Sequence, residues 1–335
     1  MLNIVGKKNI YFTISGVAVG AAIVAIAIFG FKEAVDFSGG TLWQFKMNPP
    51  TFPQSIVPSG KDLKPPFIPA AQPRGIREGG GMNSGETAIS NVKEIFQTNF
   101  AHEEVNVNYD AQNDIFLVRL KEIGEEDHQK FLQVLSTSFE GFEELSFQSI
   151  GPSIGSDLRR KAIIAMILAL IGISFYIAYA FRKASKPISS WKYGIVTLLT
   201  LFHDIAIPAG LLALLGHFSN VEIDGNFVVA LLVVVGFSVH DTIVVFDRIR
   251  ENLVLYRAKK KFSEIINESV NQTLARSVNT SLTLLLVLIS LYFVGPANLH
   301  YFILTLIVGV TTGIYSSIFI ASPGLLVASG KSIKT

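Results

Sequence analysis

The sequence predicts a helical membrane protein with six transmembrane spans and one α+β domain outside the membrane, inserted between the first and second spans. Half of the 335 residues are hydrophobic and only 16% are charged, whereas soluble domains are typically about 25% charged. The mean hydropathy is +0.45. Several runs of about 20 residues carry almost no charge, which is the length of a membrane-crossing helix.

Six apolar segments are long enough to cross a bilayer, because a helix rises about 1.5 Å per residue and the hydrocarbon layer is about 30 Å thick. We predict spans over 10–31, 162–181, 193–215, 227–246, 277–293 and 299–321. The first is longer than the roughly 7–15 apolar residues of a signal peptide. Residues 1–31 are therefore expected to form an uncleaved N-terminal anchor, and 158–335 a five-helix bundle.

The distribution of Lys and Arg predicts the orientation. Six spans place both termini, the 182–192 loop and the 247–276 loop on one side, and these segments hold many basic residues. The loops on the other side, 216–226 and 294–298, hold none. We therefore expect the first side to be cytoplasmic and residues 32–157 to lie outside the cell membrane.

Residues 32–157 have the pattern of a ferredoxin-like domain. Alternating and helical periodicities predict strands over 41–47, 105–109, 115–120 and 145–150 and helices over 86–99 and 125–139. This βαββαβ order places two helices on one face of a four-stranded sheet. Residues 48–85 contain eight of the 13 prolines. That composition predicts an extended or mobile loop, either a tolerated surface insertion or an arm that touches a partner.

Asp241 is the most informative residue, because a carboxylate inside a span costs at least about 2.5–3.5 kcal/mol. The dipeptide His240-Asp241 of the fourth span repeats His203-Asp204 of the third. Loss of water favours the neutral acid, whereas a nearby cation favours the charged form. A carboxyl group whose surroundings change can therefore load and release a proton, and Arg276, at the start of the fifth span, is the candidate cation.

Other interpretations of these residues stay open. Asp204 and Asp241 could be neutral, structural groups that bond to Ser or Thr of neighbouring helices. His203 and His240 could be packing residues rather than members of a proton relay. The 247–276 segment has an amphipathic pattern that predicts a helix at the cytoplasmic membrane surface.

Composition also excludes some functions. The net charge of +2 is too small to indicate nucleic acid as a partner, and the absence of cysteine removes disulfides and thiolate metal sites. No His and acid spacing typical of a metal site and no phosphate-binding Gly-x-x-x-x-Gly-Lys loop occurs. We expect no metal and no cofactor, with protons or sodium as the coupling ion.

Three basic residues lie on the outer side in this topology: Arg159, Arg160 and Lys161. They go against the charge rule, which is weak beside a folded domain.

Three segments, in this order along nearly the whole chain, resemble one family. Asp36-Phe37-Ser38-Gly39-Gly40-Thr41 follows the first span, residues 235–252 cover the end of the fourth span, and residues 271–281 begin the fifth. Together they resemble the SecF family of bacterial protein-export membrane subunits. The residues of the second segment that carry the likeness, besides its aspartate, are Gly236, Asp247, Arg248, Arg250, Glu251 and Asn252.

The resemblance implies a resistance–nodulation–division (RND) fold, in which six spans form half of a twelve-span unit and SecD supplies the other half. It implies an inner-membrane subunit that uses the proton-motive force in late stages of preprotein export, without covalent catalysis. The implied partners are SecD, the SecYEG channel, the SecA ATPase, YajC, the preprotein and the lipid bilayer. Asp241 and Arg276 match positions of the family's proton path.

Two departures and two rival functions accompany this resemblance. The family commonly has Asn where this chain has His240, and the 48–85 stretch enlarges the external domain. A proton-coupled RND-type exporter of small molecules or lipids is one rival, although it would need a large external substrate pocket. A passive scaffold that only stabilises the translocase is the other.

Overall fold

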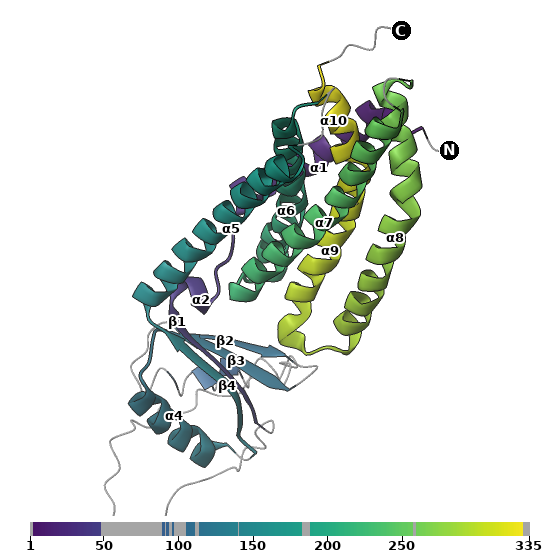
Figure 1. Ribbon diagram of the computed structural model, residues 1–335. Helices are drawn as coiled ribbons and strands as arrows, with labels where there is room; N and C mark the ends of the chain where they lie inside the picture. The colour runs from purple at the N-terminus through teal and green to yellow at the C-terminus, as the bar shows by residue number, and fades with distance from the viewer. Residues whose placement is uncertain are drawn as a thin grey trace, which may run out of the picture. The chain divides into compact units, whose positions relative to one another are not determined.

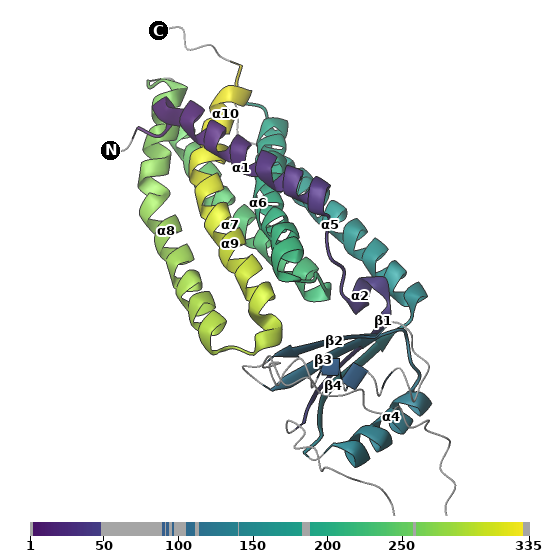
Figure 2. The same ribbon diagram turned by 180° about the vertical axis from the view of Figure 1, so that it is seen from behind.

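A computed structural model describes residues 3–47, 89–90, 92–93, 96, 105–110, 114–139, 141–182, 188–256 and 259–330. The chain divides into two compact units, a helical unit of residues 1–37 and 156–335 and a sheet unit of residues 38–155. Figures 1 and 2 show both units from opposite sides. The predicted loop 48–85 lies outside the described residues.

The described part of the helical unit has six helices long and apolar enough to cross a membrane, as predicted. A short 3-10 turn, Val5–Lys7, precedes the first helix, and a π-helical turn, η3 (Ser317–Ala321), interrupts the last. The helices are α1 (Lys8–Phe29), α5 (Pro152–Ala180), α6 (Ser190–Ser219), α7 (Gly225–Tyr256), α8 (Phe262–Val294), and α9 (His300–Ser316) continued by α10 (Ser322–Ala328).

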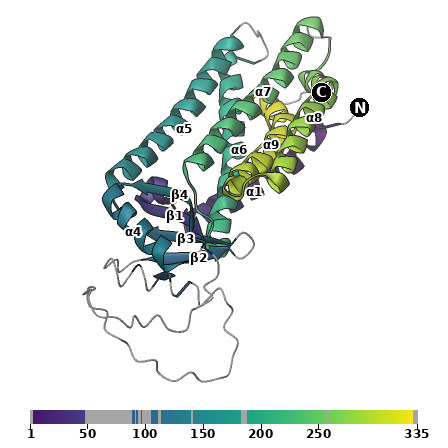
Figure 3. The same cartoon turned by 90° about the horizontal axis from the view of Figure 1, so that it is seen from below.

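Helix α6 is the central element of this unit. It contacts α1, α7 and α9, and the views in Figures 1 and 2 show it between α1 and α7. Small residues allow these close contacts. A Cβ atom on Gly210 of α6 would lie 2.4 Å from Cβ of Ala22 in α1. Helix α5 lies at one edge of the unit, away from α8 and α9 (Figure 3).

The segment 247–276 differs from the predicted loop with a surface helix. Helix α7 continues through Tyr256 and α8 already begins at Phe262, so the two helices are joined by a short connection. Ile266 and Val270 are fully buried in a core cluster with Phe246 of α7. Their amphipathic pattern therefore reflects packing between two extended helices rather than contact with a membrane surface.

The sheet unit contains a four-stranded antiparallel sheet in the order β2-β3-β1-β4. Its strands, β1 (Gly40–Lys46), β2 (Asn106–Asp110), β3 (Ile115–Leu120) and β4 (Glu143–Ile150), lie where the sequence predicts them. Helix α4 (Glu125–Ser138) follows β3. Trp43 of the central strand is fully buried among Phe96, Phe131 and Phe147. Most of the other predicted helix, 86–99, lies outside the described residues, although those described at 89–90, 92–93 and 96 are helical.

Candidate functional site

Asp204 forms the centre of a buried polar cluster contributed by three helices. Its side chain, on α6, is fully buried. The hydroxyl of Ser238 on α7 donates to Oδ2, and so does Oγ of Ser316 on α9, at 2.7 Å. Nδ1 of His203 lies 2.8 Å from Oδ1. A buried carboxyl group of this kind requires such partners, because burying an unpaired charge is costly.

Close approach of α7 and α9 allows both hydroxyls to reach Asp204. A Cβ atom on Gly309 of α9 would lie 2.2 Å from Cγ2 of Val234 on α7, so only glycine fits there. One turn further along, a Cβ atom on Gly313 would lie 3.2 Å from Cβ of Ser238. The two glycines therefore determine the separation of the helices at the level of the carboxyl group.

Asp241 lies on α7 three residues after Ser238, whose hydroxyl donates to Asp204. It is 6% exposed, and no hydrogen bond of normal geometry reaches its Oδ2 from the residues that the structure describes. The hydroxyls of Ser277 on α8 and Ser317 on η3 lie near this carboxyl group, but Oγ of Ser277 also has no hydrogen-bond partner among the described residues. Asp241 therefore has fewer hydrogen bonds than Asp204.

The π-helical turn η3 begins at Ser317, whose hydroxyl lies near Asp241. Such turns leave backbone groups displaced from the regular helical pattern and occur frequently at functional sites. Oγ of Ser317 donates to the carbonyl oxygen of Gly313 at 2.8 Å and lies 3.1 Å from Oγ1 of Thr242. Oγ of Ser322 donates to the carbonyl oxygen of Ser317 at 3.0 Å. A polar layer therefore crosses the apolar unit between α7 and η3.

The two histidines have different surroundings. His203 is buried and belongs to the Asp204 cluster. His240 is exposed on α7, beside Asp241 in the sequence. Gly236, one turn earlier, is also exposed, and nothing lies within 4 Å of a Cβ atom built on it.

Arg276 does not pair with Asp241 in this conformation. It is exposed on α8 and lines a polar cleft of about 240 Å³ with Asp247, Arg248 and Glu251. Its neighbour in sequence, Ser277, is the residue that faces Asp241. In the described residues, no cluster of His, Asp and Glu has the arrangement of a metal site.

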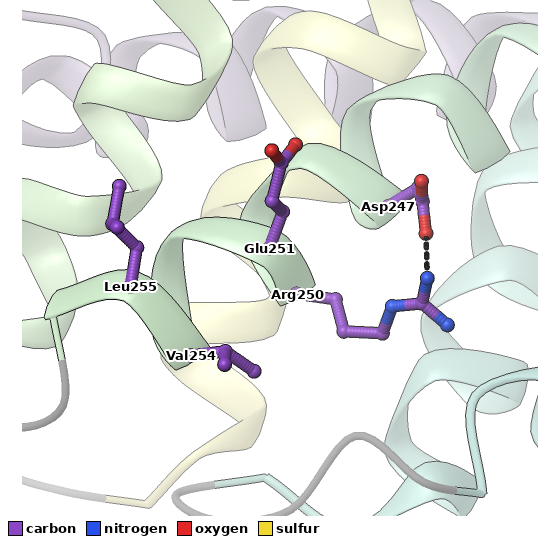
Figure 4. A pocket seen from close by; sticks show the side chains of 5 residues that line it. All are labelled: Asp247, Arg250, Glu251, Val254 and Leu255. Atoms are coloured by element: carbon purple, nitrogen blue, oxygen red, sulfur yellow. Dashed lines mark ion pairs between the residues drawn. The ribbon is translucent and has the colours of Figure 1, made fainter.

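The signature residues at the end of α7 form two ion pairs within that helix. Nη2 of Arg250 lies 2.6 Å from Oδ1 of Asp247, a pair drawn in Figure 4. Nη1 of Arg248 likewise lies 2.6 Å from Oε2 of Glu251. These pairs are separated by three residues and are partly exposed, so each adds only about 0.3–0.5 kcal/mol.

Asn252 has a larger structural role. Its side chain is buried, and Nδ2 donates to Oγ of Ser269 at 2.8 Å and to Oε1 of Gln272 at 2.9 Å. Nε of Arg248 donates to the same Oε1 at 2.6 Å. These bonds hold the extended ends of α7 and α8 together.

The signature after the first span is explained by backbone contacts. Oδ2 of Asp36 accepts a hydrogen bond from N–H of Gly225, at the first turn of α7, at 2.9 Å. Gly39 has a φ of +74°, and a Cβ atom there would lie 2.6 Å from Cα of Pro152. Gly40 has a φ of +120°. Position 36 therefore requires a carboxylate that caps α7, and positions 39 and 40 require glycine because of their positive φ.

Sequence reasoning identified the acids but not the hydroxyls around them. Ser238 was visible as the residue three positions before Asp241, and Ser316-Ser317 as a polar pair inside an apolar span. Their spacing alone does not say which face of the last helix meets α7.

Comparison with known proteins gives consistent matches. Residues 130–331 match the family model for the protein export membrane protein SecD/SecF, C-terminal. Protein translocase subunit SecF of Thermobaculum terrenum is 38% identical over 324 residues, which cover 96% of this chain and 92% of that protein. Protein translocase subunit SecDF of Thermus thermophilus is 33% identical over 304 residues, which cover 90% of this chain and 35% of that protein.

A solved structure matches as well. The crystal structure of SecDF, a translocon-associated membrane protein from Thermus thermophilus, aligns with a TM-score of 0.73 and 28% sequence identity. The alignment covers 98% of this chain and 39% of that chain. This chain therefore corresponds in extent to nearly all of a SecF subunit and to about a third of a SecDF protein.

Proposed function

Because the chain belongs to the SecD/SecF family of protein-export membrane proteins, we propose that it is a translocase subunit that couples the proton-motive force to late stages of preprotein export. It acts with SecD beside the SecYEG channel, after the SecA ATPase has driven the preprotein in, and YajC is a further partner. The observation that carries the proposed coupling is the buried pair of carboxyl groups, Asp204 and Asp241, on adjacent helices.

A SecD-type partner is supported by the polar surface of the helical unit. His240 of α7 and Arg276 and Asn279 of α8 are exposed within candidate spans. Polar side chains in a membrane face other protein or water rather than lipid, because exposure to hydrocarbon is costly. A second six-span half of the RND type would cover this surface. The Thermus thermophilus relative, whose name joins both subunits, contains such additional length.

In the proposed cycle, Asp241 exchanges its partners when it gains or loses a proton. The neutral acid gains hydrogen bonds from the hydroxyls of Ser277 and Ser317, which lie on the neighbouring elements α8 and η3. The charged form favours a cation, and Arg276 is one position, or about 100° of rotation, from Ser277 on α8. Deprotonation thus favours a rotation of α8 that brings Arg276 to Asp241. One charge moving through 100 mV releases about 2.3 kcal/mol, so a few protons can drive such a step.

The sheet unit is proposed to be an extracytoplasmic, ferredoxin-like domain that contacts the emerging preprotein. Its sheet order and α4 support the βαββαβ arrangement, and the distribution of Lys and Arg supports its placement outside. Both termini then lie in the cytoplasm.

The test compares preprotein translocation into vesicles with and without a proton gradient. We expect Asp241→Asn and Ser277→Ala to lose most of the gradient-dependent gain, whereas the gradient-independent rate stays normal. Ser290→Ala is the matched control. This exposed hydroxyl on the same helix donates to the carbonyl oxygen of Leu286, one turn earlier on α8. If Asp241→Asn keeps the full gain, the carboxyl group does not couple the gradient to export.

A further inference from the structure

An apolar crevice of about 390 Å³ opens between α5 and the helices α1, α6 and α7. Near one end of α5, Oγ of Ser174 donates to the carbonyl oxygen of Gly194 on α6 at 2.8 Å, and in its middle Met166 packs against the core cluster that includes Ala209 of α6. Towards its other end α5 diverges from α6, as the opposite views in Figures 1 and 2 both show. Met166 and Ile167 of α5 line the crevice, together with Phe202 and Ile205 of α6.

The face of α5 that lines the crevice is apolar except at one end. Arg159, Ala162, Ile163, Met166 and Ile167 all line it, with the spacing i, i+3, i+4, i+7, i+8 of a single helix face. Arg159 is the only charged residue among these five, and it lies where the uncharged run of α5 begins. The crevice therefore has an apolar body and, at one end, Arg159 beside the lining residue Glu33.

The cationic end has unused binding capacity. Nη1 of Arg159 lies 3.1 Å from Oε1 of Glu33, but the arginine side chain is still 57% exposed. A guanidinium group carries five N–H donors and can bind a second oxyanion beside a carboxylate. Arg160 is exposed next to it, and Lys161 pairs with Asp157. This run of basic residues also goes against the charge rule for an outer loop, so topology does not explain it.

We propose that this crevice binds one phospholipid with an anionic headgroup, with an acyl chain between α5 and α6 and the phosphate on Arg159. Three features favour this occupant. The crevice lies within candidate spans, where hydrocarbon chains surround the protein. Its lining is almost wholly apolar, as in sites for small apolar ligands. Its one cationic end lies at the boundary of the apolar run, which is the level of lipid phosphates, and basic residues there attract anionic lipids.

Native mass spectrometry of the purified full chain, titrated with phosphatidylglycerol or with phosphatidylethanolamine, tests the proposal. We expect one tightly retained phosphatidylglycerol per chain. Arg159→Gln should weaken its binding about tenfold, because a charge-assisted bond to phosphate is lost, and should affect phosphatidylethanolamine less. Met166→Trp, which fills the crevice, should weaken binding of both lipids, and Ile163→Phe should do so to a smaller degree.

Two matched variants serve as controls. Arg160→Gln removes a neighbouring cation that does not line the crevice, and Leu168→Trp adds the same bulk on an exposed position of α5. Both should bind phosphatidylglycerol as the unchanged chain does. Equal retention of the two lipids by the unchanged chain, or unaltered retention in both Arg159→Gln and Met166→Trp, would overturn the proposal. So would crosslinking of a photoreactive group at position 167 to protein instead of lipid in native membranes.

Discussion

Gly309→Ala is expected to disturb the Asp204 cluster from a position that carries no polar group. An added Cβ atom would lie 2.2 Å from Cγ2 and 2.7 Å from Cγ1 of Val234, whereas ordinary contacts begin at 3.4 Å. Helices α7 and α9 must therefore separate by about 1 Å, or Val234 must leave its rotamer, and overpacking of this kind costs about 1–3 kcal/mol. Separation also moves Ser238 away from Ser316. Because both hydroxyls donate to Asp204, at least one of these hydrogen bonds is weakened.

The assays are the thermal unfolding midpoint of the purified protein in detergent and gradient-dependent translocation in vesicles. We expect Gly309→Ala to lower the midpoint and to reduce the gradient-dependent gain. The double variant Gly309→Ala, Val234→Ala should recover part of both, because removing Cγ1 and Cγ2 leaves only the Cβ contact at 3.0 Å. Gly172→Ala on α5 is the control, since nothing lies within 4 Å of its added Cβ atom.

Two results would refute the close approach of α7 and α9 as the basis of the Asp204 cluster. Gly309→Ala as stable and as active as the unchanged protein would show that these helices are not packed at this distance. A failure of Val234→Ala to restore any stability would show that the loss arises elsewhere.

Three further perturbations test other parts of the structure. Ser316→Ala removes a hydrogen bond to Asp204. A typical intramolecular hydrogen bond contributes about 0.5–1.5 kcal/mol, so the unfolding midpoint should fall, and an unchanged midpoint would exclude this role. Asp36→Ala removes the acceptor for N–H of Gly225 at a cost of about 1 kcal/mol. Hydrogen exchange of backbone amides at the start of α7 should accelerate, whereas Asp36→Asn should keep these amides protected from exchange. Trp43→Ala empties a fully buried site of the sheet unit and should lower its stability by about 3–5 kcal/mol. The variant should be cleaved faster by protease, with the cuts confined to residues 38–155. Protease resistance equal to that of the unchanged protein would contradict the described core.

The spans and strands were predictable because their signals are local. A run of about 20 uncharged residues is enough to indicate a membrane helix, and alternation over five or six residues indicated β2 and β3. The acids were also visible, because a carboxylate inside an apolar run is costly wherever it points. The sequence did not show that the hydroxyls of Ser238 and Ser316 meet at Asp204. That contact depends on the separation and relative rotation of three helices, which no local pattern encodes.

The segment 247–276, predicted as a loop, shows that the sequence did not reveal where helix α7 ends. Charged residues such as Asp247, Arg248 and Glu251 ended the apolar run and suggested that the helix ended as well. Helix α7 has 32 residues, so it is about 48 Å long and exceeds the hydrocarbon layer of about 30 Å. Arg and Glu are good helix formers, and a charge therefore marks the boundary of the bilayer rather than the end of the helix.

Infrared difference spectroscopy of the reconstituted complex, recorded with and without a proton gradient, addresses the proton-carrier role of Asp241 most directly. A carboxylic acid band should change in intensity when the gradient is applied, and it should be absent in Asp241→Asn but present in Glu264→Gln, an exposed acid on α8. A spectrum in which no carboxyl group changes its proton occupancy under the gradient would contradict the proposed coupling, whatever the contribution of this subunit to export.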